Sequence, residues 1–97
     1  MLTIKEKLKV SIGYSDHTIG VVASLAAVAL GATVIEKHFT LNKRFKGTDH
    51  ILSADPLDLK LICDDVKKIS SLLGKEIKKP SKDENKIKNF MRKRFVI

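Results

Sequence analysis

The sequence has 97 residues, of which 43% are hydrophobic and 5% aromatic, with no Trp and a single Cys. A chain of this length forms one small domain at most, and its hydrophobic content is too high for a chain that is disordered throughout. The single Cys excludes an internal disulfide framework and a zinc site built from cysteines. Because aromatic anchors are few, we expect the chain to be marginally stable alone and to depend on a partner surface.

The net charge of +8 is concentrated in the second half of the chain. Residues 1–55 contain 7 Lys or Arg and 5 Asp or Glu, whereas residues 56–97 contain 12 and 6. A nucleic-acid-binding module would combine basic residues with a recognisable fold or with interleaved aromatic residues, and this tail has neither. The charge therefore favours a solvated basic surface, and we expect no nucleic-acid partner.

The first part of the sequence predicts a helix, a strand, a helix and a strand, in that order. Residues 2–8 can close a short helix, and residues 10–15 alternate apolar and small residues as a strand does. Residues 18–30 are rich in Ala and Leu, with Thr18 as a suitable N-cap and a glycine directly after the last position. Residues 32–39 then predict the second strand. Two strands joined by a helix within about 30 residues form a βαβ unit with parallel pairing.

The same region bears on membrane insertion and location. The segment between Asp16 and Glu36 has no charged residue other than a histidine, so its length approaches that of a membrane span. Its helical part, residues 18–30, is only about 13 residues long, which favours a buried core helix over a membrane helix. Residues 1–10 mix lysines with a glutamate and are no signal peptide, so we expect a cytoplasmic protein without a membrane partner.

The second part of the sequence predicts a polar loop over residues 40–55, a long helix and a basic tail. Asp55 and Pro56 suit the N-cap and the first helical position. Apolar residues then recur every three or four positions and form one stripe: Leu59, Ile62, Val66, Ile69 and Leu73. A glycine ends this helix, and a short helix is expected around residues 83–91. The result is an incomplete α/β arrangement, because two parallel strands are too few for a stable sheet.

Polar residues that could carry chemistry stand at the end of each predicted strand. They are Ser15, Asp16 and His17 in the first strand region and Glu36, Lys37 and His38 in the second. The carboxyl ends of parallel strands share one rim, so His17 and His38 could together bind a first-row divalent metal ion. The alternative that stays open is that His17 caps the following helix and that His38 is a polar residue at a strand end.

The alternation of side chains along the second strand adds further candidates. Val34, Glu36 and His38 face one way, whereas Lys37 faces the helices. Glu36 could hold an imidazole N–H or contact a substrate, and a buried ion pair with a neighbouring strand remains the alternative. Asp49, in the loop after this strand, could accept hydrogen bonds from sugar hydroxyls, or it could simply form a turn.

Several short motifs together resemble the sialic acid synthase family. They are GYSDHT at residues 13–18, AVALGA at 27–32, IEKHFTL at 35–41 and GTDH at 47–50. Each motif alone is weak, but the combination is specific. The resemblance implies an α/β fold in which residues 1–74 are the last two β/α units of a TIM-type (β/α)8 barrel. It also implies that residues 75–97 are a basic linker toward an antifreeze-like domain.

The resemblance also implies an activity. The family condenses phosphoenolpyruvate with N-acetylmannosamine or a related N-acetyl sugar to a nine-carbon sialic acid, releases phosphate and uses a divalent metal, Mn or Mg. By position, His17 and His38 would bind the metal, Ser15 would contact phosphoenolpyruvate, and Asp49 the sugar. Glu36 would line the pocket as a candidate catalytic residue. Because the other six strands are not in this sequence, we expect the chain alone to be inactive. We expect it to dock onto the remaining barrel portion or to self-associate.

Overall fold

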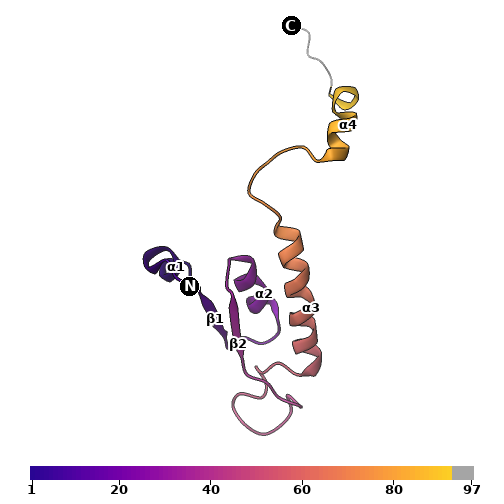
Figure 1. Ribbon diagram of the computed structural model, residues 1–97. Helices are drawn as coiled ribbons and strands as arrows, with labels where there is room; N and C mark the ends of the chain where they lie inside the picture. Colours follow the sequence, from indigo (N-terminus) through magenta and orange to yellow (C-terminus); the bar gives the residue numbers. More distant parts are fainter. Residues whose placement is uncertain (93–97) are drawn as a thin grey trace.

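The computed structural model describes residues 1–92, which form four helices and a two-stranded parallel sheet. In chain order the elements are α1 (Leu2–Leu8), β1 (Gly13–Asp16), α2 (Val22–Ala29), β2 (Val34–Lys37), α3 (Pro56–Leu73) and α4 (Lys82–Met91). Figure 1 shows β1, β2, α2 and α3 side by side, with α4 at the end of an extended segment. The last five residues of the predicted basic tail lie outside the described part of the chain.

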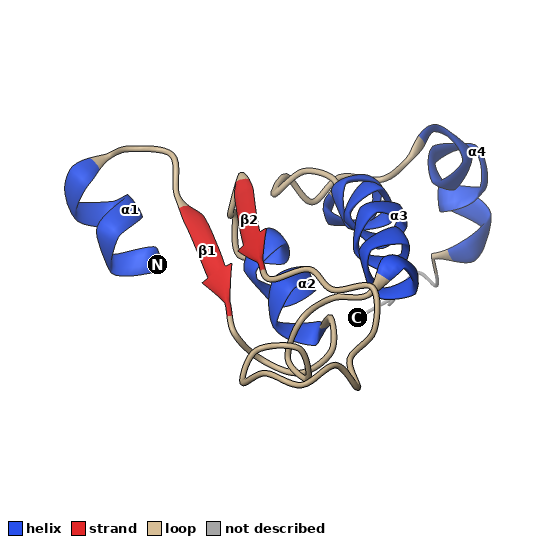
Figure 2. Cartoon of the chain, turned by 90° about the horizontal axis from the view of Figure 1, so that it is seen from below, coloured by secondary structure: helices blue, strands red, loops and turns tan. Residues whose placement is uncertain are grey.

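The predicted βαβ unit is confirmed. Strand β1 pairs in parallel with β2, with Gly13 opposite Val34 and Asp16 opposite Lys37. Helix α2 connects the strands and packs against both of them and against α3 (Figure 2). Gly13 permits this pairing because a Cβ there would lie 3.1 Å from the Val34 carbonyl oxygen. Strand β1 begins three residues later than predicted, because its ladder partner β2 begins only at Val34.

Helix α2 begins at Val22, four residues later than predicted, so the assignment of Thr18 as its N-cap is wrong. The Asp16 carboxylate accepts hydrogen bonds from the backbone N–H and the hydroxyl of Thr18, both at 2.8 Å, and this closes a turn instead. Gly20 then adopts a left-handed φ of 85°, which interrupts any helix through this segment. The predicted end is confirmed, because Gly31 has a φ of 99° directly after the last turn.

Helix α3 begins and ends as the sequence predicts. The Asp55 carboxylate accepts a hydrogen bond from the Asp58 N–H at 2.9 Å, and the Asp58 carboxylate accepts one from the Asp55 N–H at 3.4 Å. This reciprocal capping box, with Pro56 in the first turn, satisfies donors that the first turn would otherwise leave unpaired. Of the predicted apolar stripe, Ile62 is buried, whereas Leu73 is 58% exposed.

The chain buries only a small core of its own, made of Ile12, Ala27, Ala32, Ala54 and Ile62. Its radius of gyration is 20.4 Å, whereas a compact chain of this length has about 13 Å. Its accessible surface is 8580 Å², against about 5,500 Å² expected for a folded monomer of this mass. Helices α1 and α4 pack against no other helix or strand of residues 1–92. Within the same residues, no helix combines the length and the hydrophobicity that a membrane crossing requires.

Candidate functional site

The two histidines that follow β1 and β2 lie next to each other. The register that pairs Asp16 with Lys37 brings the next residues together, and the imidazole centroids of His17 and His38 are 5.4 Å apart with the ring planes at 71°. Both side chains are exposed. The residues around them line one hollow: Ser15, Asp16, His17, Glu36, Lys37 and His38. The structure therefore brings together the strand-end residues that the sequence singled out, and we name this place the histidine rim.

The spacing of the two rings fits two ligands of one metal ion. A metal–nitrogen bond of about 2.1 Å puts an ion about 3.2 Å from each ring centre, so two bound rings have centres about 5 Å apart. The observed 5.4 Å between His17 and His38 is close to this value. Residues 1–92 contain no group of three or more His, Cys, Asp or Glu that could hold an ion. The two imidazoles would therefore need further ligands from water, a substrate or another polypeptide.

A buried ion pair lies beneath the histidine rim. The Asp16 side chain is fully buried and the Lys37 side chain is 6% exposed, with Nζ 3.3 Å from Oδ2. Asp16 also accepts a hydrogen bond from the Ser24 hydroxyl at 2.6 Å, and Lys37 donates to the Thr18 carbonyl at 2.6 Å. Burial alone would raise the pKa of Asp16, but the hydrogen bonds from Ser24, Thr18 and Lys37 outweigh it and lower the pKa to about 2. The carboxylate is therefore ionised at neutral pH.

Sequence reasoning found only half of this pair. The period of two along the strand correctly directs Lys37 toward the helices, but nothing in the sequence analysis assigned a role to Asp16. The available signal was positional: each histidine is directly preceded by a charged residue, and the two charges are of opposite sign. In parallel strands of matching register, such residues face each other on the helix-covered side.

On the opposite face of the strands, Ser15 and Glu36 form the second cross-strand contact. The Ser15 hydroxyl donates to the Glu36 carboxylate at 2.7 Å, and both residues are exposed. This bond is not among the interpretations of Glu36 given by the sequence, which are a partner for an imidazole N–H, a substrate contact and a buried ion pair. The register explains the difference, because it places Ser15 directly opposite Glu36. A substrate entering the rim would therefore meet this hydroxyl and carboxylate together.

The loop after β2 returns to the same end of the sheet and brings Asp49 near His38. The Ala54 N–H donates to the His38 carbonyl at 2.7 Å, which ties the end of the loop to the rim. The buried Thr40 hydroxyl lies 2.8 Å from His50 Nδ1 and so ties the middle of the loop. Both predicted roles of Asp49 remain open: its carbonyl accepts from Ser53 in a turn, and the residue also lines a hollow that includes His38.

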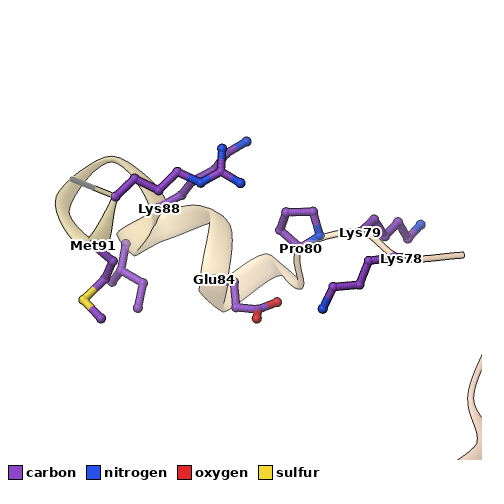
Figure 3. Close-up of a pocket in the computed structure, with 8 residues that line it drawn as sticks. Lys78, Lys79, Pro80, Glu84, Lys88 and Met91 are labelled. Carbon is purple, nitrogen blue, oxygen red and sulfur yellow. The ribbon is translucent and has the colours of Figure 1, made fainter. Parts of the chain in front are cut away.

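Another hollow lies beside α4 and is shown in Figure 3. It is lined by Lys78, Lys79, Pro80, Glu84, Ile87, Lys88, Met91 and Arg92. Glu84 is occupied in capping the helix, because its carboxylate accepts from the Ser81 N–H at 2.6 Å. Ser81 thereby caps α4, the short helix that the sequence predicts around residues 83–91. The hollow shares no residue with the histidine rim and is not part of the candidate site.

Comparison with known proteins places these residues in context. The family model described as the NeuB family matches residues 1–78. An N,N'-diacetyllegionaminic acid synthase of Campylobacter jejuni is 51% identical over 96 residues, which are 99% of this chain and 29% of that protein. The human N-acetylneuraminate-9-phosphate synthase is 45% identical over 69 residues, 71% of this chain and 19% of that protein. The chain thus spans less than a third of the length of these relatives.

A solved structure shows the same local arrangement of elements. The N-acetylneuraminic acid synthetase of Leptospira borgpetersenii aligns with a TM-score of 0.78 at 36% sequence identity. The alignment covers 92% of this chain and 31% of that one. The α/β arrangement described above therefore corresponds to one part of a larger synthetase structure.

Proposed function

Because this chain belongs to the NeuB family, we propose that it supplies part of the catalytic centre of a sialic acid synthase-type enzyme. The reaction is the condensation of phosphoenolpyruvate with an N-acetylated sugar. The observation that carries the proposal is the pair His17 and His38, side by side at the carboxyl ends of two parallel strands. Sites of α/β proteins are built at this end of their strands.

We further propose that β1 and β2 are the last two strands of a TIM-type (β/α)8 barrel. Three features support this: the strands are parallel, an α-helix connects them, and polar residues gather at their carboxyl ends. Within residues 1–92 the outer edge of β1 has no strand partner. In this arrangement residues 1–74 belong to the barrel and residues 75–97 are a linker. The family match, which ends at residue 78, supports a boundary in this region.

In the proposed reaction, C3 of phosphoenolpyruvate joins the aldehyde carbon of the open-chain sugar, water adds at C2 and phosphate leaves. A divalent ion, Mn or Mg, bound between His17 and His38 would polarise the aldehyde oxygen. The Ser15 hydroxyl donates to phosphoenolpyruvate after exchanging its bond to Glu36. Asp49 accepts hydrogen bonds from the sugar, because an ionised carboxylate only accepts and hydroxyls donate. Glu36 lines the pocket as a candidate proton acceptor.

The proposal is tested with a chimera of the Campylobacter jejuni relative, in which this chain replaces the 96 aligned residues. We expect the chimera to retain synthase activity on that relative's own substrates. His17→Ala and His38→Ala should each lower kcat/KM at least about 100-fold, because even the loss of a residue that only orients a metal ligand costs about 10–100-fold.

The matched control is Lys60→Ala, which removes an exposed side chain of α3 and should leave the activity unchanged. Full activity of both histidine variants in a folded, active chimera would refute the metal site. A folded chimera without activity would contradict the proposal that this segment supplies a competent part of the centre.

A second function is favoured by one observation, the large exposed surface of 8580 Å². A chain that exposes this much surface suits a docking piece without chemistry of its own. Its partner would be the remaining portion of the barrel or a second copy of the chain. This function requires the exposed apolar faces but not the histidine rim, so the histidine variants separate the two functions.

A further inference from the structure

Two charged residues of opposite sign directly precede the two rim histidines. Asp16 and Lys37 occupy opposite positions of the parallel ladder and form an ion pair whose side chains are 0% and 6% exposed. The pair lies on the face covered by α2, whereas Ser15 and Glu36 meet on the other face. Asp16 and Lys37 therefore form the last residue pair of the β1–β2 ladder, directly before His17 and His38.

Stability alone does not explain a pair in this position. Removing two charges from water is costly, and buried ion pairs are often replaced by apolar residues without loss of stability. This pair is nevertheless fully bonded, and within residues 1–92 no buried side-chain nitrogen or oxygen lacks a hydrogen-bond partner. Such a network instead selects one arrangement of the groups it joins.

The network holds the backbone on both sides of His17. The Lys37 ammonium contacts the Asp16 carboxylate at 3.3 Å and donates to the Thr18 carbonyl at 2.6 Å. The Asp16 carboxylate in turn accepts from the Thr18 N–H at 2.8 Å and from Ser24 of α2 at 2.6 Å. One lysine on the strand that carries His38 therefore fixes both neighbours of His17.

We propose that Asp16 and Lys37 are positioning residues that set the spacing between the imidazoles of His17 and His38. They touch no reacting atom, because both lie under the rim on the helix-covered side. The inference rests on the proposed metal site at the rim. Without the lysine, the turn that carries His17 would keep its bonds to Asp16 but would lose the Lys37 contacts that join it to β2 on the helix-covered face, and the Ser15–Glu36 bond on the other face would remain.

The test uses the full 97-residue chain, with Lys37→Met and Asp16→Asn as variants. One readout is the nuclear Overhauser contact between the ring protons of His17 and His38, whose centroids are 5.4 Å apart in the structure. The other is the dissociation constant for Mn²⁺ alone, measured by electron paramagnetic resonance. Circular dichroism reports whether each variant keeps its fold. Lys60→Met is the matched control, because it breaks an exposed ion pair, that of Lys60 with Asp64 at 2.6 Å.

We expect Lys37→Met to abolish the ring contact and to weaken Mn²⁺ binding about 10–100-fold, the range for groups that orient metal ligands. Asp16→Asn keeps the shape of the side chain and should give the same change, and the double variant should add little, because the two residues act as one unit. Lys60→Met should change neither readout. If Lys37→Met fails to fold, Asp16→Asn decides the question.

The outcomes separate this inference from the function on which it rests. An unchanged ring contact and an unchanged Mn²⁺ affinity in folded variants would overturn the positioning role and leave the metal site standing. A wild-type chain that shows the ring contact but no Mn²⁺ binding, and loses the contact in both variants, would uphold the positioning role and refute Mn²⁺ binding by the two imidazoles of this chain alone; the histidine variants of the chimera then test the metal site. A wild-type chain without the ring contact would overturn the positioning role.

Discussion

At the scale of single residues, the loop after β2 depends on one buried hydroxyl. Thr40 is 4% exposed, and its Oγ1 lies 2.8 Å from His50 Nδ1 and 3.1 Å from the Asn42 carbonyl. It also accepts a hydrogen bond from the Asn42 N–H at 3.3 Å. Asp49 directly precedes His50 in this loop. The Thr40 hydroxyl therefore helps to fix the position of the Asp49 carboxylate, the proposed sugar-binding group.

We therefore predict that Thr40→Val loosens the loop while keeping the size of the side chain. Leaving buried hydrogen-bonding groups unpaired costs about 1–3 kcal/mol. In the chimera, the KM for the sugar should rise about tenfold, and the KM for phosphoenolpyruvate should stay within about twofold. Thr40→Ser keeps the hydroxyl and should behave like the parent. Steady-state kinetics with each substrate varied in turn measures this, and an equal rise in both KM values would contradict the prediction.

At the scale of elements, the sequence predicts most where local chemistry and packing agree. Asp55-Pro56 and the apolar stripe define α3 completely, because the cap and the hydrophobic period point to the same helix. The start of α2 could not be predicted in this way. Thr18 is a good N-cap by type, but the partner of its hydroxyl is Asp16, whose position depends on burial and on Lys37 across the sheet. That His17 and His38 lie next to each other follows from the parallel register, whereas the contacts of Asp16 and Lys37 beneath them join residues far apart in the sequence.

The N-terminus of α3 carries a charge cluster with a definite pH dependence. Lys43 pairs with Asp58 and lies 3.9 Å from Asp55. The hydrogen bond from Lys43, which outweighs partial burial, lowers the pKa of Asp58 below its usual 3.8. A depressed carboxyl pKa stabilises the folded state above the unfolded pKa, and this contribution is lost as the pH falls through the folded pKa. Protonation below about pH 4 therefore weakens both the ion pair and the cap.

We predict that the free energy of unfolding of Asp58→Asn falls less steeply with decreasing pH than that of the parent. The variant should be less stable than the parent at pH 7, and the difference should shrink as the pH falls below 3.8, where the parent also loses the charge. Urea unfolding followed by circular dichroism between pH 7 and pH 2 measures this. The control is Asp64→Asn, because Asp64 pairs with Lys60 and is more exposed than Asp58. Solvent screens this pair, so Asp64→Asn should change the pH dependence of the unfolding free energy less. If the free energies of unfolding of the parent and of Asp58→Asn changed in parallel with pH, the assignment of this pH dependence to Asp58 would be refuted.

At the scale of the whole molecule, the described chain exposes surface that a domain normally buries. The excess over a folded monomer of this mass is about 3,000 Å², which is the size of an obligate interface. Apolar side chains contribute to it at both ends of the molecule: Leu2, Ile4 and Leu8 of α1 and Ile87, Phe90 and Met91 of α4 are all exposed. Figure 1 shows that nothing else in the described chain covers these two helices.

This surface leads to a prediction for the 97-residue polypeptide studied alone. We expect it to have a molar mass above the 10.8 kDa of one chain in size-exclusion chromatography with light scattering, because its apolar faces pair with one another. With Mn²⁺, phosphoenolpyruvate and N-acetylmannosamine it should release no phosphate above background. The described residues supply no third protein ligand to the two imidazoles, so the proposed metal would be held weakly, and in the proposed barrel the substrates would also need contacts from the other strands.

The active chimera serves as the positive control for the assay. A monodisperse monomer would contradict self-association, and phosphate release by the chain alone would contradict the proposal that its histidine rim is only part of a site. The two measurements are independent, because association requires the apolar faces of α1, α3 and α4, whereas catalysis requires the rim between β1 and β2. An associated but inactive chain is therefore the expected outcome, and the proposed activity should appear only when the remaining strands of the proposed barrel surround His17 and His38.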